Sequence, residues 1–388
     1  MVSIPQNNLN LRIVVLMGGA SHEREISLES GRNVVFKLSH TYTVIPVFVT
    51  KNFEFFKITH TELACNSTEE IFHQLNPSQK ILWQDLPHIA DFVFIALHGA
   101  PGENGCVQGA LEMLDMPYNG SGIFASALCM DKYKTNQFLK LQGFDTPRNF
   151  LLDQKIWKQY SPEKFWEFIT NQLDTQKVIV KPHDDGCSVL VSKAVNSTEL
   201  TEAINQIFND KKQYALIEEY ISGAELTVGI IGNNIPHALV PSQAISAAGV
   251  LSIEEKFLPG AGENQTPAPL PTDTLTRIQQ TIERAYQVIG CQGYARVDCF
   301  YTQERVVFLE FNTLPALTPA TVIFHQAAEL GLKPSEFLDI IIALGLQAHR
   351  RNSLINAVPS NPVLRAVVGQ PPHPAHTDHA HAQTAPLG

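Results

Sequence analysis

Short apolar runs separated by glycine-rich and polar breaks dominate the first third of the chain. Residues 11–17 form a continuous apolar run, which is typical of a strand buried on both faces. Further strands are expected at 42–49 and 92–97, and the polar stretch 21–30 opens a helix. This strand–helix–strand order predicts a parallel sheet with crossover helices. The segment 51–87 has no clear period and is expected to be peripheral.

The pattern changes near residue 130, where the apolar runs become shorter. Helices are expected at 107–114, 123–141, 162–173, 197–208, 272–289 and 334–346. Strands are expected at 178–181, 189–192, 216–220 and 226–231. Short strands interspersed with helices in this way indicate an α+β module that is mainly antiparallel. The fold class expected for the whole chain is therefore α/β followed by α+β.

The most informative stretch is 294–321, where two apolar runs joined by a polar break predict a β-hairpin. Because side chains alternate along a strand, Arg296 and Asp298 leave one face together, and so do Glu310 and Asn312. Mg2+ is usually held by one or two carboxylates and by the phosphates of a substrate. The two carboxylates and the amide of this hairpin fit such a cation, and a charged, solvated face is the alternative interpretation.

Composition narrows the possible partners. The chain has 388 residues, a net charge of −10 and a pI near 5.8, which fits two or three domains of roughly 100–200 residues. An acidic chain argues against nucleic acid or an anionic membrane as a bulk partner, although local lysines still allow a small anionic ligand.

The six cysteines are scattered without a CxxC pair, which suits a reducing compartment and gives no sign of zinc. No signal segment is evident, and no run approaches the ~20 apolar residues of a membrane span. The expected location is the cytoplasm.

Several polar residues lie at strand ends, where ligands of α/β proteins bind. His98 follows the third strand and is either a ligand-facing or a structural residue. Lys181 precedes a glycine turn, which fits a phosphate cradle or an ordinary β-turn, although the GxxxxGK[ST] order of a Walker loop is missing. Glu218, Glu219 and Glu225 fit the ribose hydroxyls of a nucleotide or, alternatively, a charged strand end.

Two further segments have distinct compositions. Lys256 lies in the long glycine-containing segment 247–266, and loops of this length are usually functional or disordered. The amine of Lys256 is placed to reach a phosphate. Beyond residue 351 the chain is rich in Pro, His and Ala and is expected to be disordered. We interpret the histidines of this tail as incidental composition rather than a metal site; they are His373, His376, His379 and His381.

Several motifs occur in one order along the chain. They are MGGASHEREISLESG, ALHGAPGENGCVQG, YNGSG, VIVKPHDDGCSV, LIEEYISGAELTV, EEKF, GYARVD and LEFNTLPALT. From about residue 11 to residue 346 this order resembles the D-alanine–D-alanine ligases, which are ATP-grasp enzymes of bacterial cell-wall synthesis. The resemblance implies an ATP-grasp fold with an N-terminal Rossmann-like domain. The expected domains are 1–130, 131–222 and 223–350, followed by the tail at 351–388.

The resemblance also implies ligands and roles. The expected ligands are ATP, D-alanine and two Mg2+ ions, with Mn2+ as a possible substitute, and the expected assembly is a homodimer. Lys132, Lys181 and Lys256 would contact the phosphates of ATP, and the loop of Cys187 and Ser188 would cover them. Glu218, Glu219 and Ile221 would line the adenine site, and Glu225 would bind the ribose. The metal ligands would be Asp298, Glu310 and Asn312.

For the amino-acid substrates, the resemblance implies a separate set of residues. The ammonium group of the first D-alanine would be held by Glu25, with His98 nearby. The carboxylate of the second would meet Thr321 and Val322. Arg296 and backbone N–H groups near Ala316 would stabilise the oxyanion. The residues expected to be catalytic are Glu25, Arg296, Cys187 and Ser188.

The chain departs from the family pattern at a few positions. Cys187 stands where a serine is usual, Phe257 in the substrate loop stands where a tyrosine is usual, and Ala316 replaces a glycine. Thr321 replaces a serine but keeps the hydroxyl. These differences leave open D-lactate, D-serine or another amino acid as the second substrate, and also a nucleotide-binding homologue without ligase activity. A nucleophilic role for Cys187 needs a neighbouring base, and the phosphate loop is the simpler account.

Overall fold

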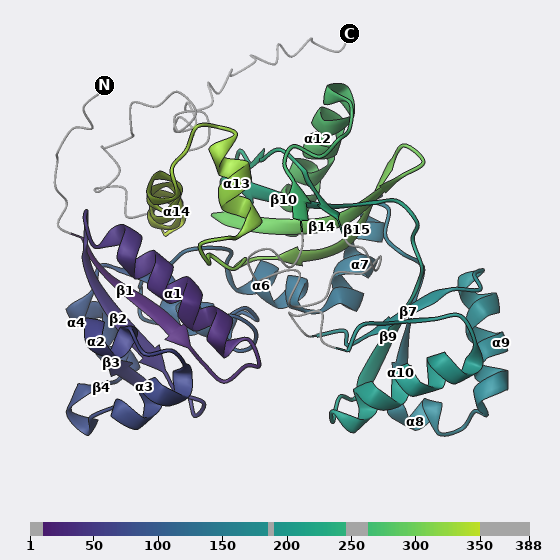
Figure 1. The fold of residues 1–388 in the computed structure, drawn as a ribbon, viewed down its shortest axis with the longest axis horizontal. Helices are drawn as coiled ribbons and strands as arrows, with labels where there is room; N and C mark the ends of the chain where they lie inside the picture. Colours follow the sequence, from purple (N-terminus) through teal and green to yellow (C-terminus); the bar gives the residue numbers. More distant parts are fainter. Residues whose placement is uncertain (1–10, 185–189, 246–262, 350–388) are drawn as a thin grey trace, which may run out of the picture.

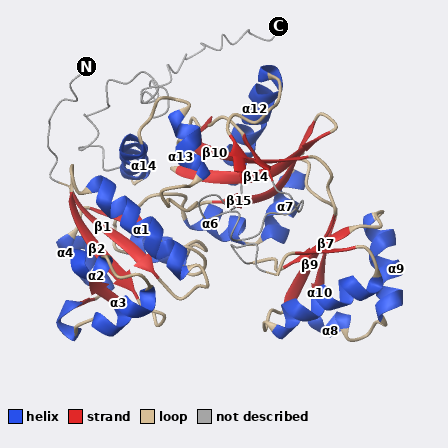
Figure 2. Ribbon diagram, viewed as in Figure 1, coloured by secondary structure: helices blue, strands red, loops and turns tan. Residues whose placement is uncertain are grey.

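Three β-sheets organise the part of the chain that the computed structural model describes, which is residues 11–184, 190–245 and 263–349 (Figure 1). Helices lie against each sheet, as Figure 2 shows. None of the described helices is both long and apolar enough to cross a membrane.

The first sheet has the order β4-β3-β2-β1-β5. Strand β1 (Arg12–Gly18) runs parallel to β2 (Thr43–Val49) and β5 (Phe92–Ile95), which confirms the predicted parallel sheet. Helix α1 (Arg24–Leu38) connects β1 to β2 and packs against β1. The remaining elements are β3 (Phe55–Lys57), α2 (His60–Leu63), α3 (Thr68–Gln74), β4 (Lys80–Ile81), α4 (Leu86–Ile89), α5 (Cys106–Met113), and 3-10 turns at Pro77–Gln79 and Trp83–Asp85.

Segment 51–87 lies at the edge of the first sheet, which agrees with the prediction that it is peripheral, but it also contributes two strands and part of the core that were not predicted. Strands β3 and β4 extend the first sheet in antiparallel pairing, and Phe55, Ile71 and Ile81 are buried in its core. These strands have three and two residues, which is too short to produce an alternating pattern in the sequence.

The second sheet is antiparallel and has the order β13-β12-β10-β14-β15, with β11 beside β10. The predicted hairpin is confirmed as β14 (Tyr294–Thr302) and β15 (Arg305–Asn312). Apolar residues on one face of these strands share a core with α12 (Thr272–Ile289), which leaves the other face for polar side chains. The other strands are β10 (Ala224–Ile231), β11 (His237–Ala238), β12 (Ser242–Ile245) and β13 (Glu263–Gln265).

The third sheet has the order β6-β9-β7-β8 and is antiparallel, as predicted for this module. Its strands are β6 (Asn149–Asp153), β7 (Val178–Lys181), β8 (Ser192–Ala194) and β9 (Tyr214–Glu219). Its helices are α8 (Gln154–Trp157), α9 (Pro162–Leu173) and α10 (Ser197–Asn209). Strand β6 was not predicted, and β8 lies further along the chain than the expected strand at 189–192.

The single helix predicted for 123–141 is in fact two, α6 (Ile123–Met130) and α7 (Lys132–Leu141). Asp131 interrupts it with an extended backbone, and its side chain accepts a hydrogen bond from the backbone N–H of Lys134. Aspartate favours such N-cap positions because its oxygen satisfies an N–H that the first turn leaves free. The break also allows the N–H of Lys132 to donate to the carbonyl of His183 in the third-sheet module.

The last two helices return the chain to the first sheet. Helix α13 (Val322–Ala328), which was not predicted, packs against β10, and α14 (Pro334–Ala348) packs against α1. Phe337 and Ile341 of α14 are buried in the same core as β1 and β5. Figure 1 shows α14 beside α1, although more than 300 residues of sequence separate the starts of the two helices.

Candidate active site

Charged side chains converge on the polar face of the β14–β15 hairpin. The guanidinium of Arg296 donates to both carboxylate oxygens of Asp298, at 3.1 and 2.9 Å, and lies 3.7 Å from Glu310. Asp298 and Glu310 are directly opposite each other in the strand register. The Nζ of Lys132 lies 3.1 Å from Glu310 Oε2, so the N-terminus of α7 contributes a second cation.

These groups are mostly buried, which strengthens their interactions. Less than one fifth of each side chain of Arg296, Asp298, Glu310 and Lys132 is exposed. Burial disfavours the charged guanidinium, but the carboxylates of Asp298 and Glu310 outweigh it and raise the pKa of Arg296. The cation therefore stays charged at any physiological pH.

The side of the site that faces the hairpin is formed by residues at the carboxyl end of the first sheet. His98 is buried and lies between Ser30, whose Oγ is 3.0 Å from Nε2, and Glu103, whose Oε1 is 3.7 Å from Nδ1. Glu103 also accepts a hydrogen bond from the N–H of Gly99 at 2.7 Å. The structure therefore holds the predicted residue His98 at the site and adds Glu103, which was not predicted.

Glu23 is a second addition, and it corrects the expectation for Glu25. The side chain of Glu25 is 55% exposed and accepts hydrogen bonds from the backbone N–H and hydroxyl of Thr68 at the start of α3, away from the hairpin. Burial and then the charge of Glu103 raise the pKa of Glu23 to about 7, with Lys132 among the groups that oppose them. Two residues along a helix turn by about 200°, so the two glutamates at its start face different ways.

The lysine expected at the nucleotide phosphates has a carboxylate partner. Lys181 Nζ lies 2.7 Å from Glu218 Oε2, and Asn136 of α7 donates to Glu218 Oε1 at 3.0 Å. Glu219 points elsewhere, because its carboxylate accepts three hydrogen bonds from Arg148 at 2.6–2.9 Å. The structure therefore brings together Lys181 and Glu218 but not Glu219.

Other predicted residues lie along the edges of this arrangement. Glu225 lies on β10, opposite Phe300, and Ile221 lies in the turn between β9 and β10. Asn312 accepts a hydrogen bond from the N–H of Leu314 at 3.1 Å. Four predicted residues, Cys187, Ser188, Lys256 and Phe257, lie outside the described residues.

The segment after β15 is anchored to α1. Leu317, directly after the buried Ala316, donates its N–H to Ser30 Oγ at 3.1 Å, and its carbonyl accepts from Asn33 at 2.7 Å. Thr321 then begins α13, and its side chain makes no capping hydrogen bond to that helix. Ser30 therefore links this segment to His98.

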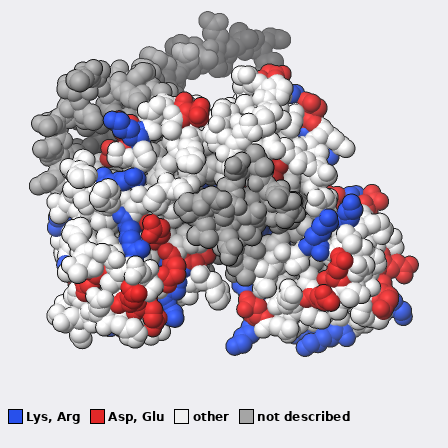
Figure 3. Space-filling view, in the orientation of Figure 1, with Lys and Arg blue, Asp and Glu red and all other residues white. Residues whose placement is uncertain are grey.

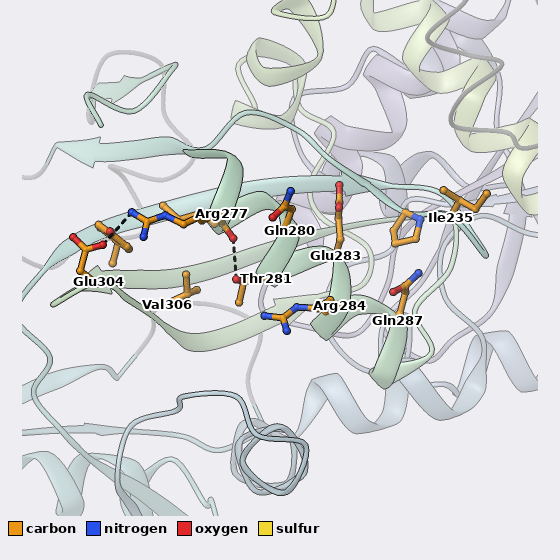
Figure 4. Close-up of a pocket in the computed structure, with 12 residues that line it drawn as sticks. Ile235, Arg277, Gln280, Thr281, Glu283, Arg284, Gln287, Glu304 and Val306 are labelled. Atoms are coloured by element: carbon orange, nitrogen blue, oxygen red, sulfur yellow. Dashed lines mark hydrogen bonds and ion pairs between the residues drawn. The ribbon is translucent and has the colours of Figure 1, made fainter. Parts of the chain in front are cut away.

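A small cavity of about 20 Å3 lies among these charges, and its lining includes Glu103, Lys132, Glu310 and Asn312. A larger hollow of about 760 Å3 lies beside α12, and its lining includes Arg277, Arg284 and Glu304 (Figure 4). None of the predicted site residues lines the larger hollow. We place the site at the smaller cavity, because buried cations and carboxylates from separate sheets converge there. On the face in Figure 3, acidic and basic side chains of the described residues are interspersed.

A parallel sheet followed by two antiparallel modules, with lysine–carboxylate pairs at their junction, defines an enzyme of the ATP-grasp fold. Family models support this: "D-ala D-ala ligase N-terminus" matches residues 12–121 and "D-ala D-ala ligase C-terminus" matches residues 138–343. The chain belongs to the D-alanine–D-alanine ligase family.

Known relatives agree with this family. The D-alanine–D-alanine ligase of Natranaerobius thermophilus is 33% identical, and the match covers 88% of this chain and 98% of the relative. The solved D-alanine–D-alanine ligase of Coxiella burnetii is 26% identical, with a TM-score of 0.74 over 89% of this chain and 96% of that one. A D-Ala:D-Ser ligase from Enterococcus faecalis matches with 26% identity and a TM-score of 0.72 over 87% and 99%. The Bacillus anthracis ligase complexed with ATP matches with 26% identity and a TM-score of 0.66 over 88% and 99%.

Proposed function

We propose that this enzyme joins two D-alanines to D-alanyl-D-alanine, at the expense of ATP, for the synthesis of peptidoglycan precursors. The observation that carries the proposal is the convergence of Arg296, Lys132, Asp298 and Glu310 on one face of the hairpin. The relatives that are 31–33% identical over most of the chain are D-alanine–D-alanine ligases.

ATP is held between the second and third sheets in this proposal. Lys132 and Lys181 contact the phosphates, and each amine already faces a carboxylate that orients it. Glu218 and Ile221 line the adenine site, and Glu225 accepts from the ribose. Because Glu219 is engaged by Arg148, it contributes through its backbone rather than its carboxylate. The roles proposed for Cys187, Ser188 and Lys256 at the phosphates rest on the family resemblance alone, because these residues lie outside the described ones.

The hairpin also suits Mg2+. Two carboxylates in register and the amide oxygen of Asn312 form the hard-oxygen set that this ion prefers. Asp298, Glu310 and Asn312 would hold two such ions, with Mn2+ as a substitute. Bound there, the metal would neutralise charge on the phosphates during transfer.

The chemistry requires an activated carboxylate. Carboxylates are poor acyl donors, so the first D-alanine takes the γ-phosphoryl group of ATP and becomes an acyl phosphate. The amine of the second D-alanine then attacks the acyl carbon, and phosphate leaves. Arg296, together with backbone N–H groups near Ala316, stabilises the negative charge on the acyl oxygen. Thr321 and Val322 receive the carboxylate of the second substrate.

The first D-alanine needs a partner for its ammonium group, and Glu23 is better placed than Glu25. Glu23 lies beside His98 and Glu103, whereas Glu25 accepts hydrogen bonds from Thr68 at the start of α3. A bound ammonium would favour the ionised form of Glu23, whose pKa of about 7 lets it take up or release a proton at neutral pH. Phe257 is proposed to lie near the same substrate.

Domain boundaries, assembly and location are part of the same proposal. We assign residues 1–130 to the N-terminal domain, 131–222 to the central module, 223–350 to the C-terminal module and 351–388 to a tail. Helix α14 nonetheless packs in the core of the first domain. A cytoplasmic homodimer is proposed from the family resemblance.

A panel of acceptors tests the function. The enzyme is incubated with ATP, Mg2+ and D-alanine alone, and then with D-alanine plus D-lactate or D-serine, and the products are weighed by mass spectrometry. We expect ADP and D-alanyl-D-alanine from D-alanine alone. A depsipeptide or mixed dipeptide as the dominant product would show a different acceptor, and ATP binding without ADP release in any mixture would show a protein that no longer ligates.

A further inference from the structure

Gln326 is a fully buried amide in α13 whose hydrogen bonds all leave its own helix. Its Oε1 accepts from the N–H of Gly229 at 2.8 Å, and its Nε2 donates to the carbonyl of Thr227 at 2.8 Å. The same Nε2 donates to Ser242 Oγ at 2.9 Å. The side chain therefore joins α13 to both β10 and β12.

The position of these contacts along β10 is informative. Thr227 pairs with Ser242 of β12, whereas β11 pairs with β10 only from Ile230 onward. Between these pairings the carbonyl of Thr227 and the N–H of Gly229 face Gln326, whose amide supplies one donor and one acceptor, as a peptide group of a neighbouring strand would, while the carbonyl of Gly229 accepts from the N–H of Leu239. Gln326 thus replaces a missing piece of strand.

The two β10 residues that hydrogen-bond to the Gln326 amide pair with site residues on the neighbouring strand β14. Gly229 is the register partner of Arg296, and Thr227 is the register partner of Asp298. The hydroxyl of Thr227 also donates to Asp298 Oδ1 at 2.8 Å. A shift of α13 along β10 would therefore change the distance between this helix and the reacting groups.

The fit at Gly229 is tight enough to fix that distance. A Cβ at this position would lie 2.8 Å from Gln326 Oε1 and 2.7 Å from Ile323 Cγ1. Because real Cβ atoms do not approach other atoms so closely, only glycine lets α13 reach the strand.

We propose that Gln326 is a positioning residue for the second substrate. Its amide holds α13, and with it Thr321, at a set distance from Arg296 and Asp298. The inference rests on the proposed function, which assigns the carboxylate of the second D-alanine to Thr321 and Val322. Gln326 does not touch the reacting atoms; it acts through the helix that carries the acceptor site.

The test compares Gln326→Met, which keeps the length but loses the amide, with Gly229→Ala, which keeps the amide but crowds the helix. The KM for the second D-alanine is expected to rise about tenfold in both, since buried polar groups lose their partners or α13 is displaced. The KM for ATP and for the first D-alanine should stay within about twofold of the wild-type values. His325→Ala, on the exposed side of the same helix, is the control and should change none of the three.

The outcomes separate the two proposals. Unchanged KM for the second D-alanine in both variants, or an equal rise in all three constants, would overturn the positioning role. If Gln326→Met does not fold, Ser242→Ala replaces it, because this change removes one hydrogen-bond partner of the Gln326 amide and buries no charge. A wild-type enzyme that makes no dipeptide would instead overturn the proposed function, whatever the variants do.

Discussion

At the residue scale, the sequence predicts pairs within strands better than residues at a helix start. Alternation along β14 correctly places Arg296 and Asp298 on one face. The sequence does not show whether Glu23 or Glu25 faces the site, because both precede the same apolar stripe of α1. Only the structure shows that Glu25 instead hydrogen-bonds to the start of α3. The signal that could have found Glu23 is its place in the loop between the glycines that end β1 and the start of α1.

Glu23→Gln and Glu25→Gln make a matched pair of variants. Loss of the charge at Glu23 should raise the KM for the first D-alanine by about tenfold to a hundredfold, as expected for a charge-assisted hydrogen bond. Glu25→Gln should leave that KM within about twofold. Steady-state kinetics with varied D-alanine checks both. The reverse order of effects would return the role to Glu25.

The raised pKa of Glu23 also predicts a pH-dependent stability. Between the unfolded value of 4.5 and the folded value of about 7, the folded state binds more protons, so stability falls as pH rises through this window. The free energy of unfolding of Glu23→Gln, relative to wild type, should therefore increase from pH 4.5 to pH 8 by on the order of 3 kcal/mol. Chemical denaturation at both pH values measures it. A constant difference between the two proteins would contradict the burial of this carboxyl.

At the element scale, long periodic segments are predictable and short or interrupted ones are not. Helix α12 has the bounds that its pattern indicates, whereas β11 and α13 are too short for a period to show, and β6 (NFLLD) has no alternation of apolar and polar residues. The break at Asp131 was missed because apolar periodicity continues across it. An aspartate that can cap a following turn was the available signal.

The turn of the β14–β15 hairpin leads to a prediction at this scale. Gln303 and Glu304 have φ of 47° and 65°, the left-handed pair of a type I′ turn that favours Asn-Gly. Replacing them by Asn and Gly should raise the free energy of unfolding by about 1 kcal/mol, because the backbone strain is relieved. Chemical denaturation measures it, and Arg277→Ala isolates the exposed ion pair with Glu304. If the Asn-Gly variant loses more free energy of unfolding than Arg277→Ala does, the assignment of the turn type is contradicted.

At the scale of the whole molecule, the end of the chain completes the core at its beginning. The sequence shows that α14 is strongly apolar around most of its surface, but apolar composition alone does not identify what the helix packs against. The structure pairs it with β1, β5 and α1, and Tyr42 donates to Asp339 at 2.9 Å. The site depends on this closure, because α1 carries Glu23 at its start and Ser30 in its first half.

Phe337→Ala tests that closure. The ring is fully buried and packs edge-on to Phe324 of α13, with ring centroids 5.9 Å apart. The substitution should lower the free energy of unfolding by about 3–5 kcal/mol, the usual cost of removing a buried phenylalanine. Phe36→Ala, at a site that is 71% exposed on α1, is the control and should cost less than about 0.5 kcal/mol. Equal effects of the two changes would show that α14 does not belong to the core.

In the proposed reaction, charged groups from the three sheets act together so that ATP can phosphorylate the carboxylate of D-alanine. The most direct measurement uses D-alanine labelled with 18O in both carboxylate oxygens and follows the label into inorganic phosphate by mass spectrometry. We expect that each dipeptide formed releases one phosphate carrying a single labelled oxygen from the activated carboxylate. Dipeptide formation with unlabelled phosphate would contradict it.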